Sequence, residues 1–276
     1  MTNLWVQFHL DANDNPSANP DKLDRFNLRL GKVEPKFGYD REVSDTLQPF
    51  FERSFFDDQV FNKPANDYQT AASVLGKIGN WGYQVSVISL DVDREFGQFD
   101  GGEAYLAELS YDFKSAWGAD KALVVVDYLH SDPNKNADVF NTMHNAVAGY
   151  LDYKKGKIGL VSQVGYMDGI ESKGNIWQIM LMPTYDITEK LQAEFRYTYG
   201  HGSNANSITT INRQISTVGG FTGDEINTFY LGANYFICGY NAHLMAGIEY
   251  TDLTGGTGPK AGFSGWTTLV GLRIYW

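Results

Sequence analysis

The stretch LQAEFRYTYG, residues 191–200, alternates strictly between two kinds of side chain. Its odd positions carry leucine, alanine, phenylalanine and tyrosine, and its even positions up to Thr198 are polar or charged. Successive side chains of a β-strand point to opposite faces, so this period of two predicts a strand with one apolar and one polar face. A soluble β-sandwich contains the same local pattern, so the number, length and connections of the strands must decide the fold class.

Period-two alternation recurs along the whole chain, and helical periodicity is scarce. Strands of soluble proteins average about 5–6 residues, whereas a tilted strand that crosses a membrane needs about 9–11. Many of the candidates run ten residues or more, which favours the membrane-spanning kind. The thirteen predicted strands are residues 4–11, 24–34, 67–77, 81–92, 103–113, 121–130, 144–154, 157–167, 175–186, 190–200, 225–237, 242–252 and 265–276.

The connections between these strands alternate between short and long. GKIGN, KKGK and DITEK are short, whereas HSDPNKNADVFNTM and the stretch 200–224 are long. Outer-membrane barrels show this alternation, because their turns are tight on one side of the membrane and their loops are long on the other. We therefore predict an all-β fold, a transmembrane antiparallel up-and-down β-barrel formed by residues 1–276 as a single domain. Its surroundings would be the lipid of the bacterial outer membrane.

The composition argues against several other classes of protein. The 33 acidic residues against 22 basic ones disfavour a nucleic-acid partner, which would need a basic surface. The single cysteine, Cys238, permits no internal disulfide, and no histidine or cysteine spacing predicts a metal site, so we expect no metal and no cofactor. No run approaches the ~18 apolar residues of a membrane-spanning helix. Aromatic residues make up 14% of the chain while its mean hydropathy is −0.32, which suits strands with one lipid-facing and one wet face.

The chain ends with TTLVGLRIYW, residues 267–276, in which bulky apolar residues again occupy every second position. We expect Trp276 at a membrane interface, where amphipathic rings are favoured, and Arg273 on the wet side of the strand. A terminal aromatic residue on such a strand also resembles the signal read by the outer-membrane assembly machinery. Aromatic residues near other strand ends, among them Tyr111, Tyr150 and Tyr153, predict interfacial girdles, although strand propensity alone enriches aromatics too.

The longest connection, residues 34–67, lies between the second and third predicted strands. Loops beyond about 12–15 residues are usually functional or disordered. This one is too apolar for a disordered linker, since it holds six phenylalanines. We expect it to fold into the lumen and narrow it; the alternative is a cap outside the barrel mouth.

Residues 26–44, FNLRLGKVEPKFGYDREVS, and residues 47–54, LQPFFERS, resemble the phosphate-selective porin O and P family. The resemblance rests on a Gly-Lys-x-x-Pro-x-Phe-Gly pattern that leads into a loop with an ERS element. It implies a homotrimer of sixteen-stranded barrels with a pore-constricting third outer loop. We then expect these strands to be the last thirteen of sixteen in an N-terminally truncated chain, which would also account for the lack of a signal peptide. The matching residues are Gly31, Lys32, Pro35, Phe37, Gly38, Phe50, Phe51, Glu52, Arg53 and Ser54.

The loop and the polar faces of the strands supply the candidate site. The expected constriction residues are Tyr39, Arg41, Phe50, Glu52 and Arg53. The residues expected to face the water of the lumen are Arg29, Glu194, Arg196 and Arg273. Anion pores are built from rings of arginine and lysine, but acids outnumber bases here, so we expect a weakly cation-preferring or poorly selective pore. Internal ion pairing that only holds the loop in place is an equal alternative.

These observations favour a porin for passive diffusion of ions and small polar solutes, with no catalytic residue. Two other classes stay open. One is a barrel enzyme of the lipase kind, because GHGSN at 200–204 places His201 two residues before Ser203 and residues two apart share a face of a strand. The other is a soluble β-sandwich or lectin-like binding protein.

Overall fold

The computed structural model describes residues 4–9, 25–44, 47–61, 68–91, 100–170, 173–211, 214 and 219–275. Thirteen strands within them form one antiparallel sheet, and each has a counterpart among the thirteen predicted strands, so the all-β prediction is confirmed. The strands are β1 (Leu4–His9), β2 (Asn27–Val33), β3 (Gln69–Ile78), β4 (Trp81–Ser89), β5 (Gly102–Asp112), β6 (Lys121–Pro133), β7 (Met143–Lys155), β8 (Ile158–Gly169), β9 (Ile176–Asp186), β10 (Leu191–Gly202), β13 (Glu225–Phe236), β14 (Ala242–Thr254) and β15 (Phe263–Ile274).

Each strand of the sheet pairs with the strand that follows it in the chain, which is an up-and-down order. The exception is β10, whose next neighbour is β13. Between them lie β11 (Ile208–Thr209) and β12 (Thr222–Gly223), a two-stranded pair within the stretch that the sequence predicted as a loop. Within the described residues β1 and β15 are the two edges of the sheet.

Several strands extend two or three residues further than predicted, each time toward the long loops. β6 continues to Pro133 and β8 to Gly169. The backbone pairing persists there although the apolar alternation has stopped: Ser131 and Asp132 still pair with Ala104 and Glu103. Alternation marks only the lipid-facing part of a strand, so it underestimates strands that continue into water.

The short and long connections lie at opposite ends of the strands, as predicted. Residues 79–80, 113–120, 156–157, 187–190 and 237–241 join strands at one end, and the second of these turns holds α3 (Lys114–Trp117). Residues 90–101, 134–142, 170–175, 203–224 and 255–262 join strands at the other end. We call these the turn end and the loop end of the sheet.

The outer face of the sheet is an apolar belt. Along β15 exposure alternates residue by residue, and the exposed positions include Trp266, Val270, Leu272 and Ile274. At the turn end aromatic rings follow one another around the sheet, with centroids 4.7 Å apart for Trp81 and Tyr111 and 4.9 Å apart for Phe113 and Trp117. Other exposed members of the belt are Val85, Leu109, Val126, Val147, Val164, Ile179, Leu181, Leu231 and Ile248.

The prediction of an interfacial girdle has different outcomes for Tyr150 and Tyr153. Tyr150 does not belong to a girdle: its side chain points to the inner face of the sheet, where it is 5% exposed and packs edge-on against Tyr39. Its neighbour Tyr153 has the opposite parity and lies with Trp117 at the turn end. Trp276 lies outside the described residues.

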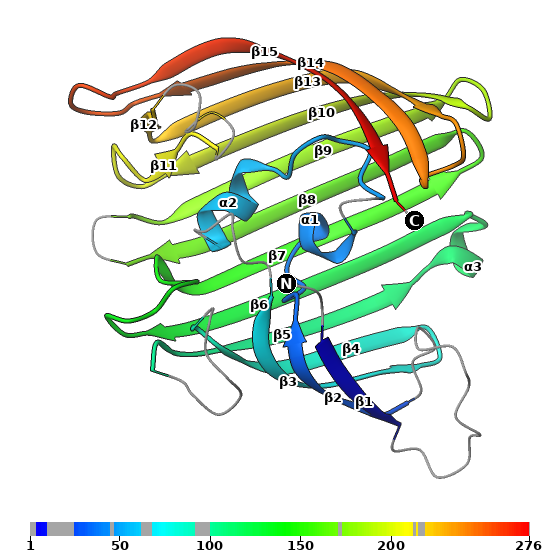
Figure 1. Cartoon of the computed structure of the whole chain (residues 1–276), viewed down its shortest axis with the longest axis horizontal. Helices are drawn as coiled ribbons and strands as arrows, with labels where there is room; N and C mark the ends of the chain where they lie inside the picture. The colour runs from blue at the N-terminus through cyan, green and yellow to red at the C-terminus, as the bar shows by residue number, and fades with distance from the viewer. Residues whose placement is uncertain are drawn as a thin grey trace.

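The inner face of the sheet curves around two short helices, α1 (Tyr39–Glu42) and α2 (Phe55–Phe61), which belong to the inserted loop (Figure 1). Neither helix was predicted, because helical periodicity cannot be recognised in so few residues. No helix in the described part of the chain is long and apolar enough to cross a membrane.

Candidate functional site

The inserted loop packs against the inner wall through phenyl rings that rest on glycines. The ring of Phe56 covers Gly165 of β8, and a Cβ on that glycine would lie 2.5 Å from Cε1 of the ring. Phe55 covers Gly200 of β10 in the same way, and Phe51 lies over Gly271 of β15. A strand glycine often marks the close approach of another group. The loop therefore lies inside the sheet, as predicted, and does not cap its mouth.

Polar side chains of the wall hold the start of α1. The backbone N–H of Gly38 donates to Oδ2 of Asp127 at 2.8 Å, and the N–H of Tyr39 donates to Oε1 of Gln163 at 2.7 Å. The first N–H groups of a helix have no partner within the helix, so these two wall residues replace a cap. Gly38 has a φ of +70°, a conformation that favours glycine, which explains why the motif ends on this residue.

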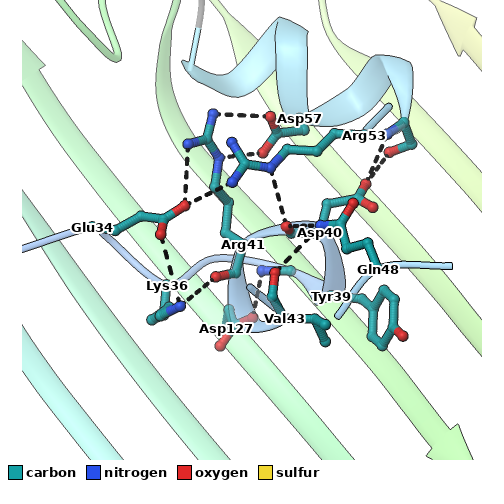
Figure 2. A network of polar contacts seen from close by, with 12 residues as sticks. Glu34, Lys36, Tyr39, Asp40, Arg41, Val43, Gln48, Arg53, Asp57 and Asp127 are labelled. Carbon is teal, nitrogen blue, oxygen red and sulfur yellow. Dashed lines mark hydrogen bonds and ion pairs between the residues drawn. The ribbon is translucent and has the colours of Figure 1, made fainter. Parts of the chain in front are cut away.

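A buried ion pair joins the two helices of the loop. Nε and Nη2 of Arg41 donate to the two carboxylate oxygens of Asp57 at 2.7 and 3.0 Å, a bidentate arrangement (Figure 2). The Arg41 side chain is 3% exposed and stacks over the ring of Phe61 at 4.0 Å. Glu34 lies 3.5 Å from Nη1 of Arg41. Arg41, predicted as a constriction residue, is thus enclosed within the loop.

Asp40 and Arg53 tie the segment after α1 back to the helix. Oδ2 of Asp40 accepts hydrogen bonds from the N–H and the hydroxyl of Ser54, at 3.0 and 2.6 Å. Arg53 donates to the Asp40 carbonyl at 3.2 Å and to Glu34 at 2.8 Å (Figure 2). Burial raises the pKa of Asp40, and the nearby carboxylate of Asp57 raises it further, against the opposing effects of Arg196 and the Ser54 hydrogen bonds.

Two arginines of the inner wall donate hydrogen bonds to backbone carbonyls of the loop. Nη1 of Arg196 on β10 donates to the Glu52 carbonyl at 2.7 Å, and its Nη2 pairs with Glu249 at 3.2 Å. Arg273 on β15 donates to the carbonyls of Gln48 at 3.1 Å and Phe50 at 3.5 Å. The inserted loop thus covers both guanidinium groups on the inner face, and Arg196 is only 3% exposed.

The other two residues expected in the lumen differ in their surroundings. Glu194 is 1% exposed and accepts a hydrogen bond from Asn234 at 3.1 Å, beneath the loop. Arg29 donates to Oε1 of Gln7 at 2.9 Å and lies over the ring of Trp5, beside an open cavity. Only Arg29 of these four arginine and glutamate side chains therefore lines open space.

Two cavities remain between the loop and the wall at the turn end. The first, of about 410 Å³, is lined by Tyr39 and Phe50 of the loop and by residues of β6 to β10. The second, of about 440 Å³, lies along β1 to β7 and contains Arg29. The constriction residues predicted from the sequence thus divide: Tyr39 and Phe50 line a cavity, Glu52 is exposed, and Arg41 and Arg53 form the internal ion-pair network.

The sequence analysis missed Asp57, Asp127 and Gln163 as partners of the loop. Alternation puts Asp127 on the polar face of its strand, but nothing in the local pattern shows which loop atom it binds. The glycines under the phenyl rings did carry a signal, because Gly165, Gly200 and Gly271 interrupt strands at inward positions where a side chain would otherwise stand.

The residues of the enzyme alternative lie at the loop end of β10. His201 shares the outward side of the strand with Tyr199 and lies 6.3 Å from the ring of Trp177. The hydroxyl of Ser203 accepts a hydrogen bond from the N–H of Asn175 at 2.9 Å. Among the described residues no hydrogen bond joins His201 to Ser203, and no group of three or more His, Cys, Asp or Glu side chains is placed to hold a metal ion.

No protein-family model matches the chain, and no curated protein sequence does. Solved structures do resemble it. OmpT of Vibrio cholerae, expressed in the outer membrane, matches with a TM-score of 0.52 at 14% identity over 91% of this chain and 77% of its own. A loop L8 deletion mutant of the same protein matches with a TM-score of 0.52 at 15% identity, over 91% of this chain and 76% of its own. A further likeness, to the NanC porin, has a TM-score of 0.38, too low to carry an argument.

The fold and the site together define a class of protein. Thirteen antiparallel strands with an apolar belt outside, aromatic rings at the turn end and a polar inner face form the fold of a bacterial outer-membrane β-barrel protein. An outward belt of this kind needs lipid around it, so the outer membrane is where this chain resides. The particular structures that it is similar to are OmpT of Vibrio cholerae and the deletion mutant of that protein.

Proposed function

We propose that the protein is an outer-membrane porin, a channel for passive diffusion of ions and small polar solutes. The observation that carries the proposal is the inserted loop, which packs on the inner face of the sheet from β6 to β15 and leaves one open cavity along β1 to β7 and another along β6 to β10. Such a loop filters by size, and the charges beside the remaining space filter by sign. No bond is made or broken in this function.

The charge of the open space supports a weak preference for cations. The arginines on the inner wall of β10 and β15 are covered by loop carbonyls, and Arg41 is neutralised by Asp57. The cavities contain Glu42 and Glu108. Of the bases that line the same cavities, Lys121 and Lys154 pair with Asp152 and Asp186, and Arg29 binds Gln7. This arrangement departs from an anion pore. The proposal therefore keeps the resemblance of the loop motif to the phosphate-selective porin O and P family, and it includes neither the phosphate selectivity nor the homotrimer that the family would imply.

Planar-bilayer recording of the folded 276-residue protein tests the channel. We expect discrete conductance steps and, in a KCl gradient, a reversal potential of the sign that indicates cation preference. Heat-modifiable mobility on a gel would confirm that the protein in the bilayer is folded. Folded protein without conductance would refute the porin, and a strong anion preference would refute the proposed selectivity.

The enzyme alternative has a separate test. We propose that the protein is not a lipase, so purified wild type and Ser203→Ala should release fatty acid from phospholipid vesicles at the same background rate. Hydrolysis by the wild type that Ser203→Ala abolishes would establish the barrel enzyme instead.

A further inference from the structure

Tyr150 stands where the two open cavities meet. Both cavities are lined by Glu42, Leu123 and Tyr150, although the first also includes residues of β8 to β10 and the second residues of β1 to β5. Tyr150 is 5% exposed, and its hydroxyl has no hydrogen-bond partner among the described residues. A buried hydroxyl normally finds a partner, because leaving one unsatisfied costs about 1–3 kcal/mol. The position of Tyr150 and the missing partner of its hydroxyl together indicate that this hydroxyl binds a ligand that enters from the cavities.

Two carboxylates stand near Tyr150 on the inner wall. Glu108 and Asp127 stand directly opposite each other in the pairing of β5 with β6, so their Cβ atoms lie about 4.5–5.5 Å apart. Tyr150 is the diagonal neighbour of Asp127, because Asp127 pairs with Ala148, two residues earlier on β7. Asp127 is 2% exposed; one of its oxygens binds the N–H of Gly38, and the other, Oδ1, has no hydrogen-bond partner in the described part of the chain.

The bases near this point bind other groups. Lys36 donates to the carbonyls of Arg41 at 2.8 Å and Glu42 at 3.4 Å. Lys121 pairs with Asp152 at 2.5 Å. The remaining bases at the two cavities are Arg29, which binds Gln7, Lys154, which pairs with Asp186, and Lys77 at the end of β3.

We propose that Glu42, Glu108, Asp127 and Tyr150 form a binding site for a small monovalent cation at the junction of the two cavities. The carboxylates attract the charge, and the unpartnered oxygens of Tyr150 and Asp127 replace part of its hydration shell. Binding is transient, which conduction requires, and differs from a fixed metal centre. The inference rests on the proposed channel, in which this site is the step that favours cations over anions.

Conductance of the whole protein in bilayers tests the site with K⁺ as the probe. Glu108→Gln removes one charge and keeps the shape, and it should lower the K⁺/Cl⁻ permeability ratio roughly twofold or more. Tyr150→Phe removes only the hydroxyl and should raise the K⁺ concentration that half-saturates the conductance. Asp252→Asn removes one charge from the outward side of β14 and should change neither quantity. Wild-type behaviour of both Glu108→Gln and Tyr150→Phe would overturn the site.

A binding measurement separates the site from the channel. The ²³Na resonance of NaCl should broaden in the presence of the folded wild type in detergent, and Glu108→Gln should reduce this broadening while Asp252→Asn should not. If the broadening depends on Glu108 but no conductance is found, the porin is refuted and the cation site stands. Equal broadening by the wild type and Glu108→Gln refutes the site whether or not the protein conducts.

Discussion

Phe56 of the inserted loop occupies the space above Gly165 of β8 that a side chain on this glycine would need. The ring is 2% exposed and lies 6.5 Å from the ring of Phe37, so the contact belongs to the core of the loop. Gly200 and Phe55 repeat the arrangement two strands away. The glycines of the wall therefore determine how deep the loop lies, and thereby how much of the inner space stays open.

Gly165→Ala should loosen the loop. A Cβ at this position would come 2.5 Å from Cε1 and 2.7 Å from Cζ of Phe56, and overpacking of this kind costs about 1–3 kcal/mol. We expect faster proteolysis between residues 34 and 67 and a larger single-channel conductance. Gly149→Ala is the matched control, since a Cβ there has its nearest neighbour at 3.8 Å. Equal proteolysis of the two variants would show that Phe56 does not depend on the glycine.

The ion pair of Arg41 with Asp57 should show strong coupling. Arg41→Met leaves Asp57 buried without its partner, which costs about 3–5 kcal/mol, whereas replacing both charges by apolar groups is often nearly neutral. The double variant Arg41→Met with Asp57→Leu should therefore lose less free energy of unfolding than the sum of the single variants. Urea unfolding in lipid vesicles measures the cycle. Additive single effects would mean that the two side chains act independently.

The sequence predicts the sheet well because lipid imposes a regular pattern on it. Apolar residues must face outward at every second position, so strands such as β10 and β15 can be recognised from alternation alone. The alternation of loop lengths then gives the membrane topology, and six phenylalanines show that residues 34–67 pack on something. Each of these properties is local, which is why one sequence is enough.

The site could be predicted only in part, because its contacts join residues far apart in the chain. Alternation puts Arg196 and Arg273 on the inner face but does not show that loop carbonyls would cover them. Charge counts alone could not tell a filter from an internal ion pair, and Arg41 with Asp57 forms the pair. Tyr150 was assigned to the wrong face, because its aromatic neighbour Tyr153 suggested a girdle where parity gives opposite sides.

Arg273→Ala should free the part of the loop that lies against β15. Its guanidinium group donates to the carbonyls of Gln48 at 3.1 Å and Phe51 at 3.4 Å, a forked geometry that an ammonium group cannot reproduce. We expect larger fluctuations of the open-channel current in Arg273→Ala. Arg273→Lys keeps the charge and should give an intermediate effect. Open-channel fluctuations as small as those of the wild type in both variants would contradict the role of this contact.

Leu231→Arg should hinder insertion into lipid. Leu231 lies on the outward side of β13 and is 58% exposed, as expected for a side chain that contacts acyl chains. An arginine on the lipid face costs about 2–4 kcal/mol near the middle of the bilayer. The fraction of heat-modifiable protein after folding into vesicles should fall, while Leu231→Met should fold like the wild type. Normal folding of Leu231→Arg would place this face away from lipid.

The stability of the loop should decline as the pH rises above the ordinary pKa of Asp40. Burial and the charge of Asp57 raise the pKa of Asp40 above its usual 3.8, so the folded loop favours the protonated form. The stabilisation of the loop by protonated Asp40 is therefore complete below pH 3.8 and is lost as the pH rises through the higher pKa that Asp40 has in the folded protein. The rate of proteolysis of residues 34–67 measures this change in stability, with proteases that are active in acid and at neutral pH. Asp40→Asn should flatten this pH dependence, whereas Ser54→Ala, which removes a bond that favours the charged form, should steepen it. A pH profile unaltered by Asp40→Asn would assign the titration to another group.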